Sequence, residues 1–245
     1  MRRSLRPAAA ALGVAATLAL PSGALADTAQ NLQCSGTYTG TYDNVTVPSG
    51  QVCNISDSTI RGNVTVQSAA SLTLSGSGSV GGNLFVGPQA GAYEDSGWVI
   101  AGTAAAERAG DLSITGTVHG LLANGTDSLD IQNATIDGNV VSNRGVYGGL
   151  ISSSVIRGNV VVNGTTGTTG IPAAWYIAGP QLDGSPQEID GNLALTDNQA
   201  TIYNIDNHIH QNLVCLGNTP GPVDLQNTVD GRSIGQCAAG SGSAG

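Results

Sequence analysis

The sequence predicts an all-β protein built as a single-stranded parallel β-helix, or β-solenoid. Three observations predict this fold class. A short motif returns at a nearly constant interval, aliphatic and small residues alternate inside the motif, and 36 of the 245 residues are glycine. We expect about nine or ten coils of ~19–20 residues, with a right-handed coil favoured.

The motif reads aliphatic-x-Gly-Asn-aliphatic-x-aliphatic. Complete copies begin at Ile60, Val80, Ile156 and Ile189, and the copy at Ile136 differs only in its last residue. Weaker copies lack the Asn (118–122) or the Gly (209–214), and 43–47 is a plausible first copy.

The motif glycines return at a fixed spacing. Gly62 and Gly82 are 20 residues apart, Gly120 and Gly138 are 18 apart, and Gly138 and Gly158 are 20 apart. A fixed period of this size is typical of a solenoid. Alternation with period 2 inside the motif predicts strands rather than helices. The Leu-x-x-Leu-x-Leu framework of leucine-rich repeats is absent from the sequence, so a parallel β-helix remains.

Stacking explains what the motif residues do. A single coil cannot bury its aliphatic side chains, whereas coils stacked at ~4.8 Å align Val64, Leu84, Val140 and Val160 in one core. We expect the motif glycine to supply a positive φ at the corner. We expect the next residue to form a structural ladder of stacked amides at Asn63, Asn83, Asn139, Asn159 and Asn192.

The first 26 residues have the pattern of an export signal. Three arginines precede the alanine-rich stretch 8–20, and Ala24-Leu25-Ala26 has the small-x-small pattern of a cleavage site. We therefore predict a signal peptide (1–26), a parallel β-helix domain (27–237) and a flexible tail (238–245), secreted to the extracellular space. The paired arginines leave both the Sec and the twin-arginine route open. The apolar stretch is too short to span a membrane.

The predicted mature chain is strongly acidic. Removal of three arginines leaves five basic against 17 acidic residues, a net charge of −12, and the chain contains no lysine. Phosphate binding needs clustered cations, so we expect no nucleic-acid partner. No residue pattern predicts a cofactor.

The four cysteines lie in two pairs, one near each end of the predicted rod. The pairs are separated by 19 residues (Cys34, Cys53) and 22 residues (Cys215, Cys237), about one coil each. An exported chain forms disulfides by default. We predict the bonds Cys34–Cys53 and Cys215–Cys237, because pairing between the two ends would join atoms tens of ångströms apart.

Two segments break the period, 87–110 and 164–188, and each carries one of the two tryptophans. We expect loops or irregular coils there. Because 98–102 resembles 175–179 at an offset of 77, Trp98 and Trp175 are predicted four coils apart along one flank, roughly 19 Å from each other. Exposed rings in that arrangement could contact a sugar ligand. In the alternative interpretation, each indole pins its own loop against the rod with its N–H bonded.

Asp206, His208 and His210 alternate, so in a strand they would share one face and could hold zinc or copper. The alternative is a polar, solvated face. The x position of the motif forms a further column, in which Asp137 and Arg157 should be neighbours on adjacent coils. It predicts either a charged recognition stripe or a mixed surface ladder of weak ion pairs.

The Gly-Asn coils resemble two groups of proteins. The first is the secreted right-handed parallel β-helix (pectin-lyase-like) group of pectate lyases and polygalacturonases, which implies the fold. The hydrolases' Asp-Asp pair and Lys are absent here, and His119-Gly120 precedes 124–127 rather than following it. Arg144 and Arg157 lack the clustered acids that accompany the lyase base. No catalytic residue therefore carries over. The second is the bactofilin-like polymer-forming repeats. Their repeat motif Ile-x-Gly-Asn-Val matches the motif of this sequence more closely, although those filaments are cytoplasmic.

From the sequence we expect a secreted, non-catalytic structural or adhesive protein of the bacterial cell exterior. An extracellular polysaccharide-binding or polysaccharide-degrading β-helix protein is the alternative, so a polysaccharide is the expected partner class. An ice-binding solenoid is a further alternative. The column of Thr65, Phe85, Val141, Val161 and Ala194 is not a threonine ladder, which disfavours ice binding.

Overall fold

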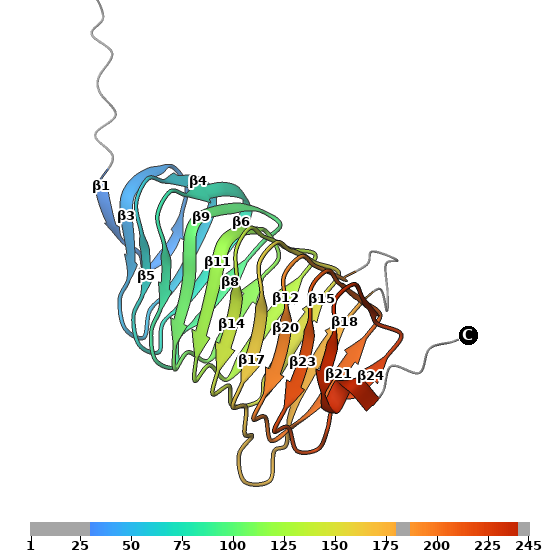
Figure 1. Cartoon of the computed structure of the whole chain (residues 1–245). Helices are drawn as coiled ribbons and strands as arrows, with labels where there is room; N and C mark the ends of the chain where they lie inside the picture. The colour runs from blue at the N-terminus through green and yellow to red at the C-terminus, as the bar shows by residue number, and fades with distance from the viewer. Residues whose placement is uncertain (1–29, 180–186, 240–245) are drawn as a thin grey trace, which may run out of the picture.

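The protein is a parallel β-solenoid of about ten turns (Figure 1). A computed structural model describes residues 30–179 and 187–239. The predicted signal peptide lies outside the described residues. Most of the predicted tail does too, although residues 238–239 belong to a short 3₁₀ helix, η1 (Gln236–Ala239). None of the described helices is long and apolar enough to cross a membrane.

Every pairing between strands is parallel, and each strand pairs with strands one coil away in the sequence. The strands therefore form three stacked rows, which we name by residues they carry.

The motif face contains the strands that follow each Gly-Asn pair. They are β1 (Gln30–Gln33), β3 (Thr41–Val47), β5 (Val64–Val66), β7 (Leu84–Val86), the second halves of β9 (Gly97–Glu107) and β11 (Thr117–Asn124), β14 (Val140–Asn143), β17 (Val160–Asn163), β20 (Leu193–Thr196), β23 (Leu213–Leu216) and β26 (Ser233–Gly235).

The tyrosine face contains the next strand of each coil. Its strands are β2 (Gly36–Tyr38), the first halves of β4 (Val52–Ile60) and β6 (Ser71–Val80), β8 (Gly91–Glu94), β10 (Asp111–Ile114), β12 (Ser128–Gln132), β15 (Gly148–Ser152), β18 (Ala173–Ala178), β21 (Ala200–Ile205) and β24 (Val223–Leu225).

The histidine face closes each coil. It contains the first residues of β3, the ends of β4 and β6, the starts of β9 and β11, and the short strands β13 (Thr135–Ile136), β16 (Val155–Ile156), β19 (Gln187–Ile189), β22 (Asn207–Ile209) and β25 (Thr228–Val229).

The core is the continuous column that the motif predicts. Val64 pairs with Leu84 and Val140 pairs with Val160, and Ala104 and Leu121 fill the two coils between them. These side chains are buried. Each coil thus covers the aliphatic residues of its neighbours, which no isolated coil could do.

The expected role of the motif glycine is wrong. None of the glycines of the complete motifs has a positive φ. A Cβ at Gly158 would lie 2.5 Å from the carbonyl carbon of Gly138 on the previous coil, and one at Gly191 would lie 2.5 Å from the Gly158 oxygen. Glycine is required because backbones of successive coils approach closely there. Positive φ occurs at other corners, often at non-glycine residues such as Arg108 and Asp206.

The Asn side chains of the motif stack as expected. Asn159 donates its backbone N–H to Asn139 Oδ1 at 2.8 Å, and Asn192 does the same to Asn159 at 2.9 Å. Asn83 and Asn63 are joined in the same way at 2.8 Å. The ladder therefore runs in two sections, separated by the coils that carry Thr103 and Gly120 in place of Asn.

Both predicted disulfides are present, Cys34–Cys53 and Cys215–Cys237, each with 5.5 Å between its Cα atoms. Each joins neighbouring coils at one end of the rod. The described residues include no free cysteine.

Of the two segments expected to be irregular, the first is regular. β8 and β9 form a complete coil, and Gly102 lies over Gly82 with its N–H bonded to the Gly82 oxygen. This motif copy has Thr103 and Ala104 in place of the Asn and the larger aliphatic residue that follows it, so the pattern hides it. The second segment does interrupt the coil, with an insertion between β17 and β18 that projects from the rod (Figure 1).

Trp98 and Trp175 are both fully buried, so the prediction that they form an exposed flank is wrong. Trp98 lies beside Gly78 and donates to the Ser75 oxygen at 2.9 Å. Trp175 lies beside Gly149, on the tyrosine face, and donates to Thr165 Oγ1 at 3.0 Å. A Cβ at Gly78 would lie 2.7 Å from the Trp98 ring, so that indole fills the space above the glycine. Both indole N–H groups are bonded, as in the alternative interpretation.

Candidate functional site

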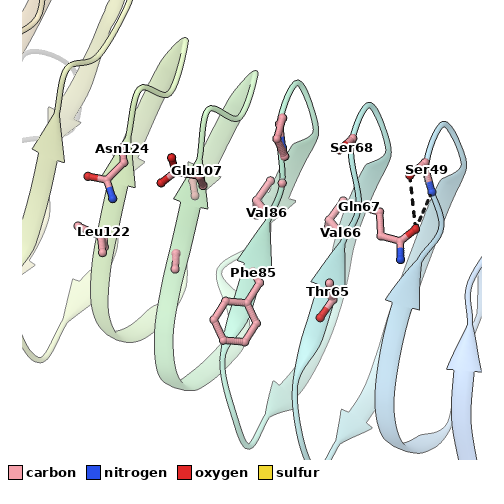
Figure 2. A pocket seen from close by; sticks show the side chains of 14 residues that line it. Ser49, Thr65, Val66, Gln67, Ser68, Phe85, Val86, Glu107, Leu122 and Asn124 are labelled. Atoms are coloured by element: carbon pink, nitrogen blue, oxygen red, sulfur yellow. Dashed lines mark hydrogen bonds between the residues drawn. The ribbon is translucent and has the colours of Figure 1, made fainter.

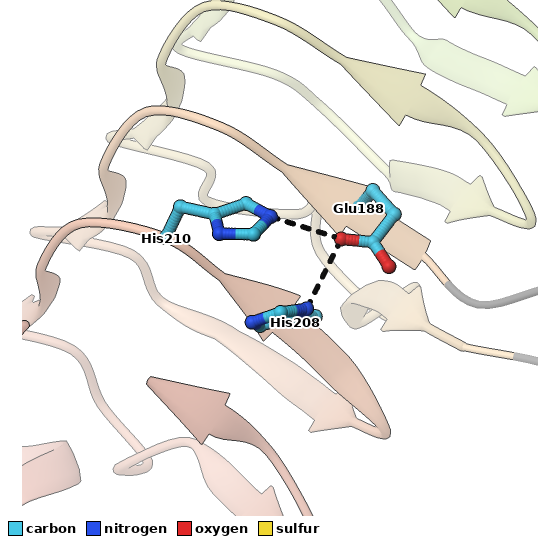
Figure 3. Close-up of side chains that lie close together, drawn as sticks. All are labelled: Glu188, His208 and His210. Carbon is cyan, nitrogen blue, oxygen red and sulfur yellow. Dashed lines mark hydrogen bonds and ion pairs between the residues drawn. The ribbon is translucent and has the colours of Figure 1, made fainter. Parts of the chain in front are cut away.

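A histidine–carboxylate cluster lies on the histidine face, on three successive coils. Register places Glu188 of β19 beside His208 of β22. The Oε2 atom of Glu188 lies 3.2 Å from His208 Nδ1 and 3.2 Å from His210 Nε2 (Figure 3). One potential ligand atom from each of the three residues lies within 4.8 Å of the others.

Asp206, the third residue of the predicted ligand set, does not belong to this cluster. It lies between β21 and β22 with a φ of 53°. The chain turns a corner there, so the strand alternation that would align Asp206 with His208 ends one residue before the histidines. Glu188, which lies 20 residues before His208, takes the place in the cluster that was predicted for Asp206.

A second carboxylate lies beside the other ring nitrogen of each histidine. Asp230, on the coil after the histidines, lies 2.9 Å from His210 Nδ1 and 3.4 Å from His208 Nε2. The imidazole rings are 4.1 Å apart between centroids. Each ring therefore faces Glu188 with one nitrogen and Asp230 with the other. Glu188 and Asp230 were missed in the sequence, although they lie one period before His208 and one period after His210.

The carboxylates affect protonation in the cluster. The hydrogen bond to Asp230 raises the pKa of His210; desolvation opposes this shift, and the hydrogen bond to Glu188 adds to it. The hydrogen bonds from His210 and His208 lower the pKa of Asp230. The same face carries the expected ion pair between Arg157 and Asp137 on adjacent coils.

The outward side of the motif face carries an apolar column. The register aligns eight apolar side chains on successive coils, Phe85, Ala105, Leu122, Val141, Val161, Ala194, Val214 and Ile234. Phe85 and Ile234 are each 42% exposed. On the same outward side of these strands, Glu107 is the only charged residue. A chain with a net charge of −9 thus leaves one long face almost without charge.

A hollow interrupts this column between Phe85 and Leu122 (Figure 2). The coil between them carries Ala105, whose small side chain leaves space between two large ones. The hollow has a volume of about 440 Å³, and Gln67 and Glu107 lie among its lining residues.

The tyrosine face carries a stacked aromatic pair. Tyr176 and Tyr203 have ring centroids 4.9 Å apart and an angle of 12° between planes. Tyr176 is 46% exposed. Trp175 points inward, and its neighbour Tyr176 therefore points outward, so the exposed aromatic group lies next to the one that the sequence suggested.

Comparison with protein families, with curated proteins and with solved structures gives no match. The resemblances to the pectin-lyase-like and bactofilin-like groups therefore rest on the coil motif alone.

Proposed function

We propose that this protein is a secreted, non-catalytic structural protein of the cell exterior, whose rods associate through their motif faces. The observation that carries the proposal is the apolar, almost charge-free column from Phe85 to Ile234. The two disulfides fit an oxidising, extracellular environment.

Charge decides which partner suits this face. A second copy of an acidic rod is repelled wherever carboxylates meet, and the motif face is where two copies meet with least repulsion. The strands of this face stack in one parallel row along the rod (Figure 1), which presents the column to a partner over many coils. Contiguous exposed apolar surface of this kind is typical of an interaction site.

The area of the face is large enough for such a contact. Eight stacked positions at ~4.8 Å extend about 34 Å along the rod, and three outward columns give a width of roughly 20 Å. Two copies in contact would then bury on the order of 1,400 Å² in total, within the range of stable interfaces. The hollow beside Ala105 offers room for a large side chain of the partner.

Sedimentation velocity over a concentration series tests the proposal. Wild-type protein is expected to associate, and Val161→Glu, which places a charge in the middle of the apolar column, is expected to remain monomeric. Thr135→Glu is the matched control, since Thr135 points outward from the histidine face at a similar height in the rod. A wild-type protein that is monomeric throughout, or a Val161→Glu protein that associates equally, would contradict the proposal.

Polysaccharide binding is a second candidate, and the Tyr176–Tyr203 pair supports it. The two rings stack at 4.9 Å and Tyr176 is 46% exposed, and a tyrosine ring offers the combination of apolar surface and polar tip that suits sugars. A glycan array with Tyr176→Ala tests this candidate. Tyr93→Ala is the control, because Tyr93 is 43% exposed on the same face. Equal glycan signals from both variants would exclude the Tyr176–Tyr203 pair as the binding site.

A further inference from the structure

We infer that Glu188, His208 and His210 form a binding site for a borderline divalent transition-metal ion, zinc or copper. The site is independent of the association proposed above, because it lies on a different face. Three residues from two coils supply it, and a third coil holds the ligands in place.

The distances between the ligand atoms suit such an ion. Zinc binds imidazole nitrogen and carboxylate oxygen at about 2.0–2.1 Å, so two ligands of a tetrahedral site lie about 3.3 Å apart. The Glu188 oxygen is 3.2 Å from the facing nitrogen of each histidine. One ligand atom from each of the three residues lies within 4.8 Å of the other two, so a bound ion would draw the two imidazole nitrogens closer together.

Asp230 completes the arrangement. Its Oδ1 accepts from His208 Nε2 and its Oδ2 from His210 Nδ1 when those nitrogens carry hydrogen. With a metal bound at His208 Nδ1 and His210 Nε2, the ring hydrogens lie on the nitrogens that face Asp230, and these bonds orient both rings. A carboxylate that orients a ligating histidine through its other nitrogen is the usual support of a metal site.

Two imidazoles and one carboxylate select the class of ion. Imidazole suits zinc and copper, whereas calcium and magnesium prefer all-oxygen ligand sets. A fourth position is left for water or for Asp190, whose Oδ1 lies 3.8 Å from His210 Nε2. Bound metal would join β19 to β22 and, through Asp230, to the coil of β25. It would fasten the same end of the rod that Cys215–Cys237 closes.

Calorimetric titration of tag-free protein with Zn²⁺ tests the inference, with Ca²⁺ as the control ion. We expect one Zn²⁺ per chain, a rise in melting temperature on binding and no response to Ca²⁺. Glu188→Gln and His208→Ala are expected to weaken binding at least tenfold, and Asp230→Asn by about 10- to 100-fold. His119→Ala is the matched control, because His119 is an exposed histidine of the same face outside the cluster, and it should bind as the wild type does.

Cobalt provides a second measurement on the same proteins. Co²⁺ at this site should give visible absorption bands of four-coordinate cobalt that Glu188→Gln abolishes or shifts. Each variant is first checked by circular dichroism, and Glu188→Gln preserves side-chain shape if His208→Ala does not fold. Absence of stoichiometric Zn²⁺ binding, or unchanged binding in both Glu188→Gln and His208→Ala, would overturn the inference.

Discussion

The Oε2 atom of Glu94 lies 2.8 Å from the backbone nitrogen of Gly116, on the next coil. Glu94 points into the core, in the column that carries Leu74 and Ile114 on the neighbouring coils, and only 4% of it is exposed. Its other oxygen, Oε1, has no hydrogen-bond partner. Burial raises the pKa of Glu94 to about 7, although the bonds from Gly116 and Thr115 favour the charged form and oppose the shift.

The raised pKa of Glu94 predicts a pH-dependent stability. A carboxyl whose folded pKa lies above its unfolded value of 4.5 stabilises the fold fully below pH 4.5, and this contribution is lost as the pH rises toward 7. A shift of this size corresponds to about 3 kcal/mol. We expect Glu94→Gln to be more stable than wild type at pH 8 and similar to it at pH 4.5, measured by denaturant unfolding.

Other groups of this acidic chain titrate over the same range. The relevant quantity is therefore the difference in the free energy of unfolding between wild type and variant at each pH. Glu107→Gln is the control, because that side chain is 58% exposed. Its difference from wild type in the free energy of unfolding should stay nearly constant between pH 4.5 and 8. A stability difference between wild type and Glu94→Gln that is independent of pH would show that Glu94 does not titrate in this range.

The motif glycines allow a test of close coil stacking. Gly158→Ala would place a Cβ 2.5 Å from backbone of the previous coil, and we expect a loss of about 1–3 kcal/mol in the free energy of unfolding. Gly120 lies in the Asn column beside Thr103, and its nearest neighbours would lie 3.7 Å from a new Cβ. Gly120→Ala should therefore be tolerated. Equal losses in the two variants would indicate that the backbone conformation, not contact between coils, requires glycine.

The C-terminal disulfide should protect the last coils. Val223 and Leu225 are 39% and 52% exposed there, so few buried contacts hold the last coil. We expect Cys215→Ser/Cys237→Ser to lose about 2–4 kcal/mol and to be cut by trypsin after Arg232 faster than wild type, as followed by mass spectrometry. Cleavage after Arg157, in the middle of the rod, is the internal control. Unchanged cleavage after Arg232 would mean that this coil is stable without its disulfide.

The coil, its core and its disulfides could be predicted because they depend on spacing alone. Residues one period apart lie beside each other in a solenoid, which is why Val64 and Leu84, or Cys34 and Cys53, could be paired from their numbers. The role of the motif glycine could not be predicted in this way. Positive φ and close backbone contact both favour glycine, and only the distance to the previous coil separates the two reasons.

Only the two histidines of the candidate site could be predicted from the sequence, for a related reason. His208 and His210 were selected by alternation within one strand, but the ligands that complete the cluster come from neighbouring coils. Applying the 20-residue period to the histidines would have indicated Glu188 and Asp230 in place of Asp206. Likewise, pairing Trp98 with the residue one period earlier finds Gly78 opposite it, a sign that the ring fills space in the core. The period does not find Gly149 opposite Trp175, because an insertion lies between their strands.

The Asn ladder provides a last prediction. Asn159 Oδ1 accepts from both the backbone N–H and the side-chain amide of Asn192, at 2.9 Å each, and Asn159 Nδ2 donates to Asn139 Oδ1 at 3.1 Å. Asn159→Ala removes the acceptor of the Asn192 backbone N–H at a half-buried position, while the Asn192 side chain keeps its bond to Gln211, and we expect a loss of about 1–3 kcal/mol. Asn143→Ala is the control, since Asn143 donates only one side-chain bond, to Asn124 Oδ1.

Hydrogen exchange should locate the effect: in Asn159→Ala the backbone amide of Asn192 should exchange faster, while amides on the coils of β5 and β7 keep their rates. Uniformly faster exchange along the rod would instead mean that the coils unfold as one cooperative unit.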